Sequence, residues 1–268
     1  MAIIASWIYD RPLRGNYTFT HDEVAQAFPD MSAGSIARAL TREVSKGRIM
    51  SPLRGFYVIV PDEYVLRGAV PQSFYLDDMM HHLGRKYYVA LLSAASYHGA
   101  SHQVPLRFSV MIEPPAMRDK KGEKYLTHFF CKSHIPETYV ERRQTRTGYI
   151  NVSCPELTAV DLLTYQAKTG SVSRAATVLA ELAEKLDFER LGADFVKEVP
   201  VTSLQRLGYI LDEVLEEGEA AESVYSLLKC SGFALQYVPL KVGKSSEGCE
   251  RNAKWRIIVN ETIEIDEL

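Results

Sequence analysis

Residues 19–60 read FTHDEVAQAFPDMSAGSIARALTREVSKGRIMSPLRGFYVIV, and this stretch decides the fold of the N-terminal part of the chain. Thr20 and Glu23 are spaced as a capping box, in which each side chain accepts a hydrogen bond from the backbone N–H of the other residue. Phe19 and Val24 stand at the positions of a hydrophobic staple around this cap. The pattern therefore predicts a short helix that begins after Thr20 and ends at the following proline.

The residues after that proline predict a tight turn and a second helix. Ser32 can cap the N-terminus of this helix, with Met31 and Ile36 again in staple positions. Gly47 suits the position just beyond its C-terminus, where a left-handed backbone is common. Two short helices joined by a tight turn are the helix-turn-helix arrangement.

The helical periodicity gives the second helix two different faces. At 100° per residue, Ile36, Ala37, Leu40 and Val44 fall on one arc, which we expect to face the core. The opposite arc offers cations for phosphates and hydroxyls for base edges, as a helix in the major groove requires. The residues on that polar arc are Ser35, Arg38, Thr41, Arg42, Ser45 and Lys46.

A β-hairpin is predicted directly after this helix. Residues 48–53 and 56–60 have strand character, and Arg54-Gly55 between them suits a tight turn. An amphipathic helix over the first ten residues or so can cover the helix pair from the other side. The order helix, helix, helix, hairpin predicts a winged helix-turn-helix domain over residues 1–60. Arg48 and Arg54 of the hairpin join the six polar-arc residues as predicted DNA-binding residues.

The distribution of charge is compatible with a nucleic-acid contact at this end. Residues 1–60 hold seven basic and five acidic side chains, a net charge of +2, so the remainder carries −5 of the total of −3. A basic N-terminal region in an otherwise acidic chain favours a contact with DNA that is confined to the N-terminal domain.

The rest of the chain predicts a larger domain of mixed α+β character. Residues 61–75 contain prolines and a glycine and are expected to form a connector, and residues 76–268 form the C-terminal domain. In this domain we expect a buried helix over residues 87–97, a strand at 108–112 and helices at about 173–186 and 203–216. Residues 235–240 and 254–259 return to strand character.

Composition excludes several classes of protein. No run of about 18 apolar residues occurs, and the first residues lack the basic leader of a signal peptide, so we predict a cytoplasmic protein. The four cysteines have neither metal-knuckle nor redox-pair spacing and are expected to be reduced thiols. No phosphate-binding loop, dinucleotide fingerprint or zinc pattern is present, so no cofactor and no metal ligand are predicted.

The candidate catalytic residues of the C-terminal domain are expected to have structural roles. Ser96, His98 and Gly99 invite comparison with a nucleophile elbow, but this segment is predicted to be helical rather than a strand followed by a turn. His81 and His82 diverge by about 100° on a helix and cannot share a metal. Without a convergent acid, base and nucleophile, we expect no catalytic residue and no enzymatic activity.

The body resembles a known family at several blocks of sequence. Residues 88–105, YVALLSAASYHGASHQVP, resemble the start of the C-terminal domain of AbiEi-type antitoxins, and the strand RFSVMIE follows as it does there. Residues 153–163, SCPELTAVDLL, are similar to a later segment, although an Arg often precedes the Thr in the family and Thr158-Ala159-Val160 departs from this pattern. Further similar blocks, in the family's order, are Leu207–Leu211, Tyr237–Leu240 and Trp255–Asn260.

The resemblance implies a function. Members of the family join a winged-helix domain to this C-terminal domain, repress their own promoter on double-stranded DNA and counter AbiEii, a nucleotidyltransferase toxin, in abortive phage infection. Two alternatives stay open, namely a nucleic-acid-processing enzyme with a winged-helix targeting domain and a ligand-sensing repressor. A neighbouring nucleotidyltransferase gene would favour the antitoxin. Metal-dependent cleavage of nucleic acid would favour the enzyme, and release of operator DNA by a small molecule would favour the ligand-sensing repressor.

Overall fold

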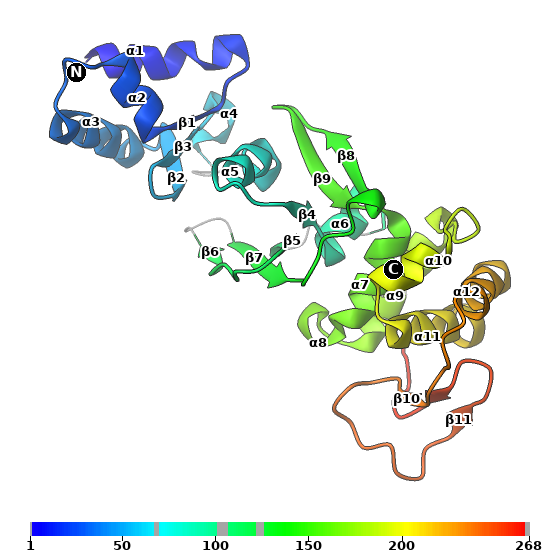
Figure 1. The fold of residues 1–268 in the computed structure, drawn as a ribbon. Helices are drawn as coiled ribbons and strands as arrows, with labels where there is room; N and C mark the ends of the chain where they lie inside the picture. The colour runs from blue at the N-terminus through cyan, green and yellow to red at the C-terminus, as the bar shows by residue number, and fades with distance from the viewer. Residues whose placement is uncertain (1, 67–69, 101–106, 122–125, 266–268) are drawn as a thin grey trace. The chain divides into compact units, whose positions relative to one another are not determined.

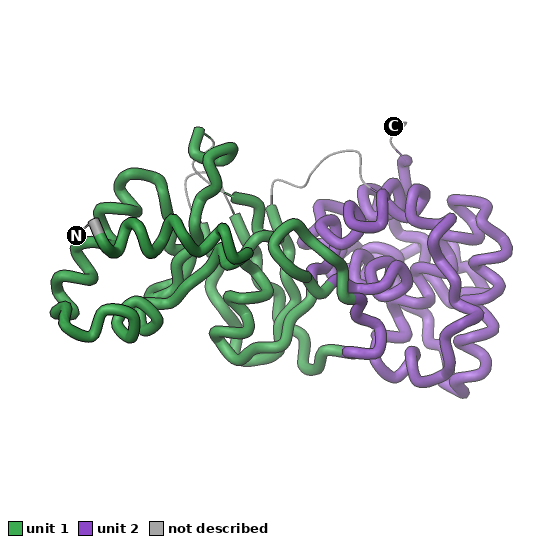
Figure 2. Tube along the Cα trace, turned by 90° about the horizontal axis from the view of Figure 1, so that it is seen from above, with its two compact units in different colours: residues 1–88, 106–135, 142–151 green, residues 89–105, 136–141, 152–268 purple. Residues whose placement is uncertain are grey.

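The fold was analysed in a computed structural model, which describes residues 2–66, 70–100, 107–121 and 126–265 (Figure 1). Its contacts divide the chain into two compact units, coloured separately in Figure 2. Unit 1 comprises residues 1–88, 106–135 and 142–151, and unit 2 comprises residues 89–105, 136–141 and 152–268. The described residues have a mixed α+β architecture, with several helices and three separate sheets.

Unit 1 begins with three helices and a three-stranded sheet. The elements are α1 (Ala2–Asp10), η1 (Pro12–Arg14), β1 (Thr18–Thr20), α2 (His21–Ala27), α3 (Ala33–Ser45), β2 (Ile49–Leu53) and β3 (Phe56–Ile59). The sheet order is β1-β3-β2, with both neighbours antiparallel to β3. The sequence therefore located α1, α2, α3 and the β2–β3 hairpin, but it did not reveal that β1 adds a third strand.

Local chemistry explains where these elements begin and end. The capping box is complete, because the Thr20 hydroxyl accepts the Glu23 N–H at 3.1 Å and the Glu23 carboxylate accepts the Thr20 N–H at 2.7 Å. Ser32 caps α3 by accepting the N–H of Ser35 at 3.3 Å. Gly55 between β2 and β3 has φ +79°, a conformation that L side chains rarely adopt.

A compact apolar core joins these elements. Trp7 packs edge-on against Phe19 and Phe28, with ring centroids 5.5 and 6.2 Å apart, and Phe19 stacks on Tyr57 at 5.3 Å. Helix α3 and the sheet both contribute side chains to this core. The buried members are Ile4, Ile8, Phe19, Val24, Ile36, Ala39, Leu40, Ile49 and Ile59.

The segment predicted to be a connector contains ordered elements, except for residues 67–69, which lie outside the described part of the chain. It forms α4 (Asp62–Val65) and η2 (Gln72–Phe74), and α5 (Leu76–His82) follows. Phe74 is buried, and its ring meets those of Tyr17 and Tyr64 edge-on at 6.1 and 5.3 Å. Aromatic contacts of this kind hold the segment against the rest of unit 1.

A six-stranded sheet of order β6-β7-β5-β4-β9-β8 follows. Its strands are β4 (Tyr87–Val89), β5 (Phe108–Ile112), β6 (Lys120–Lys121), β7 (Leu126–Cys131), β8 (Val140–Gln144) and β9 (Tyr149–Ser153), with η3 (Glu137–Tyr139) before β8. Strand β7 pairs parallel to β5 and antiparallel to β6. Residues 101–105 of the family-like stretch after Tyr88 lie outside the described residues.

The expectation of one buried helix over residues 87–97 was wrong in its first part. Tyr87–Val89 is strand β4, Leu91 has φ +56°, and α6 (Leu91–Tyr97) begins at this turn. The three residues of β4 are all buried, and Val89 pairs with Val152 of β9. A short apolar run fits a buried strand as well as a buried helix, so periodicity alone could not distinguish them.

Unit 2 contains a helical block built around α7 (Pro155–Thr164), in which every residue from Pro155 to Leu163 is buried. The other helices are α8 (Gln166–Thr169), α9 (Val172–Leu182), η4 (Ala183–Lys185), α10 (Ala193–Glu198), α11 (Val201–Tyr209), the π-helical turn η5 (Ile210–Val214) and α12 (Gly218–Cys230). Helices α6, α9 and α11 all pack against α7. Buried Glu156 at the start of α7 pairs with Arg190 at 2.8 Å.

A small sheet of order β10-β12-β11 ends unit 2. Its strands, β10 (Val238–Pro239), β11 (Arg251–Asn252) and β12 (Ile257–Ile258), are much shorter than the predicted strands at 235–240 and 254–259. The buried Trp255 interrupts the second of these, because its indole N–H donates to Asp212 at 2.8 Å and its carbonyl accepts from Gln205 at 2.9 Å.

Candidate nucleic-acid interface

Helix α3 buries a different face from the one that the periodicity predicted. Ile36 and Leu40 are buried as expected, but Ala39 and Glu43 are buried with them. Ala37 and Val44 are exposed, so their assignment to the core was wrong. Helix α3 packs against α1, α2 and β2 through the arc that contains Ile36, which leaves Ala37 and Val44 exposed beside it.

The open face carries the residues predicted to meet DNA. Arg38, Thr41, Arg42, Ser45 and Lys46 are exposed, and Ser35 is half-buried. Arg38 and Arg42 are one helical turn apart, and Arg38 donates a long hydrogen bond of 3.4 Å to the Ser35 hydroxyl. This side of α3 thus combines two guanidinium groups with hydroxyls and two exposed apolar side chains.

The hydroxyl groups of this face donate within the helix. Thr41 Oγ1 donates to the Ala37 carbonyl at 2.8 Å, and Ser45 Oγ donates to the Thr41 carbonyl at 3.0 Å. Each oxygen can still accept a hydrogen bond. To donate to a base or a phosphate, either hydroxyl must first give up its backbone partner.

Lys46 and Arg48 share the carboxylate of Glu43, which the sequence did not single out. Lys46 Nζ lies 2.7 Å from Glu43 Oε1, and Arg48 Nη1 lies 3.8 Å from Glu43 Oε2. The guanidinium carbon of Arg48 also lies 5.1 Å from the ring centre of Tyr9 on α1. These two cations are therefore partly neutralised, and less of their charge is available to a phosphate than the sequence suggested.

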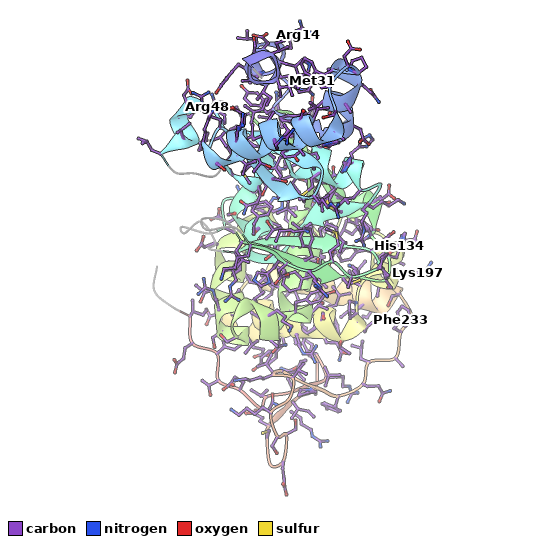
Figure 3. All side chains as sticks on the ribbon, turned by 90° about the vertical axis from the view of Figure 1, so that its left-hand side faces the viewer. Arg14, Met31, Arg48, His134, Lys197 and Phe233 are labelled. Atoms are coloured by element: carbon purple, nitrogen blue, oxygen red, sulfur yellow. The ribbon has the colours of Figure 1, made fainter. Side chains whose placement is uncertain are left out.

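Arg54 occupies the tip of the β2–β3 hairpin and is exposed. Figure 3 shows the side chains of this region, with Arg48 at the start of the hairpin labelled. The eight predicted residues therefore fall into three groups. Lys46 and Arg48 lie at the Glu43 carboxylate, Arg54 lies at the hairpin tip, and the other five lie on the exposed side of α3.

The candidate catalytic residues of the body have structural partners. His98 is buried, and its Nε2 lies 2.7 Å from the Ser153 carbonyl. The left-handed position in the turn from β4 to α6, where a nucleophile elbow would place its nucleophile, holds the apolar Leu91. Within the described residues, no three His, Cys, Asp or Glu side chains cluster as metal ligands would, and the four cysteines are free thiols.

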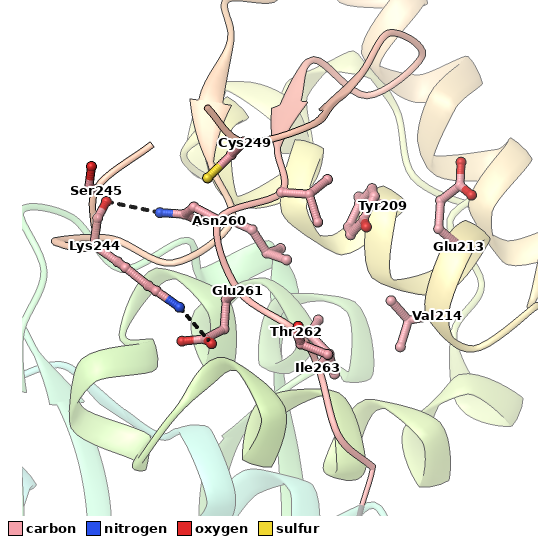
Figure 4. A pocket seen from close by; sticks show the side chains of 12 residues that line it. Tyr209, Glu213, Val214, Lys244, Ser245, Cys249, Asn260, Glu261, Thr262 and Ile263 are labelled. Atoms are coloured by element: carbon pink, nitrogen blue, oxygen red, sulfur yellow. Dashed lines mark hydrogen bonds and ion pairs between the residues drawn. The ribbon is translucent and has the colours of Figure 1, made fainter. Parts of the chain in front are cut away.

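A cavity of about 580 Å³ lies in unit 2 between η5 and the C-terminal residues (Figure 4). Lys244 on its wall pairs with Glu261 at 3.1 Å, and Asn260 donates to the Lys244 carbonyl at 3.0 Å. Its volume suits a small ligand, but these polar groups already bind one another. The cavity therefore gives the ligand-sensing alternative no specific support.

None of the helices in the described part of the chain has the length and apolar character needed to span a lipid bilayer.

Comparison with protein families finds a match over residues 88–213, to the model of the AbiEi antitoxin C-terminal domain. The match supports a relation between this chain and the AbiEi-type antitoxins. The match contains the stretches after Tyr88, at 153–163 and at 207–211, whereas the similar blocks at 237–240 and 255–260 lie beyond it. The AbiEi domain supports a role as an antitoxin in a toxin–antitoxin system.

Among solved structures, the chain is similar to the crystal structure of the RV2827C protein from Mycobacterium tuberculosis. The two share 16% sequence identity with a TM-score of 0.66, and the similarity covers 96% of this chain and 89% of the other. The AbiEi domain and the residues on both sides of it thus share one fold with that protein. A comparison with curated proteins finds no match.

Proposed function

We propose that the chain is a DNA-binding transcriptional regulator that represses its own promoter and acts as the antitoxin of an AbiEii-like nucleotidyltransferase toxin. In this proposal residues 1–60 are a winged helix-turn-helix domain, residues 61–75 a connector, and residues 76–268 the AbiEi-like C-terminal domain. The chain acts in the cytoplasm on double-stranded DNA, without catalysis and without a cofactor. The antitoxin family of residues 88–213 supports the second half of the proposal.

The open face of α3 is the observation on which the DNA-binding role depends. Arg38 and Arg42 project from a helix whose opposite face is fixed in an apolar core, so an approaching duplex meets a rigid basic surface. A guanidinium can bind a guanine edge with two hydrogen bonds or pair with a phosphate. Ala37 and Val44 beside them can contact thymine methyl groups, which adds an apolar element to the readout.

The test is binding of the full chain to its own promoter DNA at several salt concentrations. If Arg38 contacts a base, Arg38→Ala should cost about 1–3 kcal/mol and relax specificity at one position. If Arg54 contacts a phosphate, Arg54→Ala should weaken all sequences alike and lower the salt slope by about one. Lys46→Ala should have a smaller effect than Arg54→Ala, because Glu43 already holds the ammonium group.

A matched control removes the same charge elsewhere. Arg14 on η1 and Lys185 on η4 are exposed and belong to neither α3 nor the β2–β3 hairpin, so Arg14→Ala with Lys185→Ala should leave promoter binding nearly intact. Unchanged affinity and salt slope in a folded Arg38→Ala, Arg42→Ala protein would exclude α3 as a recognition helix.

The antitoxin role has a separate test. The proposal predicts an AbiEii-like nucleotidyltransferase gene beside that of the chain, and expression of the chain should restore growth to cells that express this toxin. The purified chain should show neither nuclease nor nucleotidyl-transfer activity with Mg²⁺ or Mn²⁺. Asp161 is a buried acidic residue of α7. Activity that Asp161→Ala abolishes in a folded protein would favour the enzyme instead.

A further inference from the structure

Two arginines lie against one tyrosine at the small C-terminal sheet of unit 2. The guanidinium carbons of Arg251 and Arg256 lie 5.3 and 5.0 Å from the ring centre of Tyr237. Arg256 Nη1 also donates to the Tyr237 hydroxyl at 3.2 Å. Both arginines are exposed, so each guanidinium group lies against the Tyr237 ring at the surface.

The strand pairing brings these three residues together. Tyr237 directly precedes β10 and Arg256 directly precedes β12, and the two strands pair in parallel with Val238 opposite Ile257. Arg251 begins β11, which pairs with the other edge of β12. The cluster is therefore a product of the sheet and does not depend on neighbouring positions in the sequence.

The backbone at Arg256 is held in an unfavourable conformation. Arg256 has φ +54°, in the left-handed region, whereas the residue before it is the buried Trp255. The Asn252 side chain accepts the Trp255 N–H at 2.9 Å and Asp212 accepts the indole N–H at 2.8 Å, so the tryptophan cannot relax. Backbone strain that the surroundings enforce is typical of positions that must present a side chain in one direction.

The two arginines differ from the lysines around them in having no acidic partner. Lys241 and Lys244 pair with Glu261, and Lys254 pairs with Asp212. Arg251 and Arg256 form no ion pair with any residue that the structure describes. Residues 237–259 hold five basic and two acidic side chains, a net charge of +3 in a chain whose total is −3.

We propose that Arg251, Arg256 and Tyr237 form a site for the phosphate groups of a nucleotide or of a single nucleic-acid strand. The two positive charges repel each other, and a phosphate that pairs with the guanidinium groups offsets this repulsion. A base of the same ligand can stack on the outer face of an arginine plane. This site is distinct from the face of α3 and belongs to the other unit.

The proposal is tested on the full chain carrying Arg38→Ala and Arg42→Ala, so that α3 does not contribute to binding. The side-chain Nε–Hε NMR signals of Arg251 and Arg256 are followed on addition of inorganic phosphate, of AMP and of a short oligouridine. Shifts with phosphate and AMP indicate a nucleotide as the ligand, and shifts with the oligouridine alone indicate a strand. Unmoved signals with all three probes would overturn the proposal.

Variants then link the site to affinity. Arg251→Ala with Arg256→Ala should weaken oligouridine binding at least about tenfold, the loss expected for one or two charge-assisted hydrogen bonds. The salt slope should fall by about 1.4, or roughly 0.7 for each phosphate that the arginines no longer neutralise. Lys168→Ala with Lys185→Ala removes equal charge from exposed positions of the same unit and should change neither quantity. An equal loss in this control, or none in the arginine variant, contradicts the assignment.

Conservative variants keep the test valid if the alanines disturb folding. Arg251→Lys with Arg256→Lys retains the charge but loses the planar fork and should still weaken binding. Tyr237→Phe keeps the ring that positions both arginines and should bind nearly as well as the parent, whereas Tyr237→Leu should not. Full affinity in both the lysine pair and Tyr237→Leu would show that the cluster does not form a site.

Discussion

Gly208 of α11 is in contact with the indole ring of Trp255, so no side chain fits at this position. A Cβ atom built on Gly208 would lie 1.9 Å from Cζ3 of Trp255. The ring cannot move aside, because hydrogen bonds fix its N–H and its backbone. The absence of a side chain at Gly208 therefore lets the small sheet attach to the helical block.

Gly208→Ala should lower the free energy of unfolding by at least about 3 kcal/mol, at the upper end of the usual cost of overpacking. Denaturant unfolding measures the change. Gly218→Ala at the start of α12 is the matched control, because nothing lies within 4 Å of its added Cβ. It should be neutral or slightly stabilising, by up to about 1 kcal/mol. Similar behaviour of the two variants would show that the helix–tryptophan contact is not close.

Asp212 makes stability depend on pH through the same tryptophan. Burial raises the pKa of its carboxyl, but hydrogen bonds from Lys254 and Trp255 and the charge of Lys254 outweigh this and lower the pKa below its ordinary 3.8. The carboxylate therefore contributes stability that is present above pH 3.8 and is lost as pH falls through the lowered value.

In urea unfolding between about pH 5 and 3, the free energy of unfolding should fall more steeply for the parent protein than for Asp212→Asn. Asparagine can keep a hydrogen bond to the indole but does not titrate, which isolates the contribution of the charge. Parallel curves for the two proteins would mean that the pKa of Asp212 is the same in the folded and unfolded chains.

At the scale of elements, the segment around η2 is fixed to unit 1 by an aromatic residue rather than by charge. Phe74 is 6% exposed and contacts Tyr17, Tyr64 and the guanidinium of Arg146. The ion pair between Arg146 and Glu63 reaches the same segment, but its partners are 56% and 47% exposed. Exposed pairs contribute little to stability, whereas removal of a buried ring leaves a cavity.

Phe74→Ala should therefore cost about 3–5 kcal/mol of unfolding free energy and make residues 61–75 sensitive to limited proteolysis. Glu63→Gln is the companion variant and should leave both measurements close to those of the parent. If the charge substitution opened the segment as much as the loss of the ring, the ion pair would be the principal contact.

Sequence reasoning succeeded where structure is locally determined. The capping box at Thr20 and Glu23, the Ser32 cap and the turn at Gly55 each involve residues within a few positions of one another, and all are present. It failed where distant segments compete for a residue. Tyr87–Val89 became a strand because β9 pairs with it, and α3 buried Glu43 rather than Val44 because of where α1 and the sheet cover the helix.

At the scale of the whole molecule, the sequence predicted the fold class and indicated the family. It did not predict which residues from distant parts of the chain lie in contact. The mixed α+β class and the AbiEi resemblance followed from short motifs in a fixed order. The Tyr237 cluster and the Gly208–Trp255 contact join residues far apart in the chain, and no local pattern indicates either. The candidate residues on α3 could be named in advance, whereas the carboxylate that holds Lys46 and Arg48 could not.

The proposed division of labour is best tested in the full chain, because a cut at residue 60 would remove packing partners of the N-terminal elements. Phe56 lies 5.6 Å from His82, ring centre to ring centre, and Tyr17 lies 6.1 Å from Phe74. The exposed pair Arg38→Ala and Arg42→Ala removes the basic face while leaving these contacts in place. It should abolish repression of the chain's own promoter and still protect cells from the toxin.

Both readouts can be taken in the same cells, with a reporter gene behind the promoter and growth after toxin induction, at equal protein levels by immunoblot. Under the proposed function, repression depends on binding energy from α3, so the loss of two guanidinium groups should raise reporter expression close to its unrepressed level. Protection should match that of the parent protein, because residues 88–213, which match the AbiEi antitoxin domain, are unchanged. If protection disappeared together with repression, the DNA-binding face would itself be part of the antitoxin activity, and residues 76–268 could not be assigned that role alone.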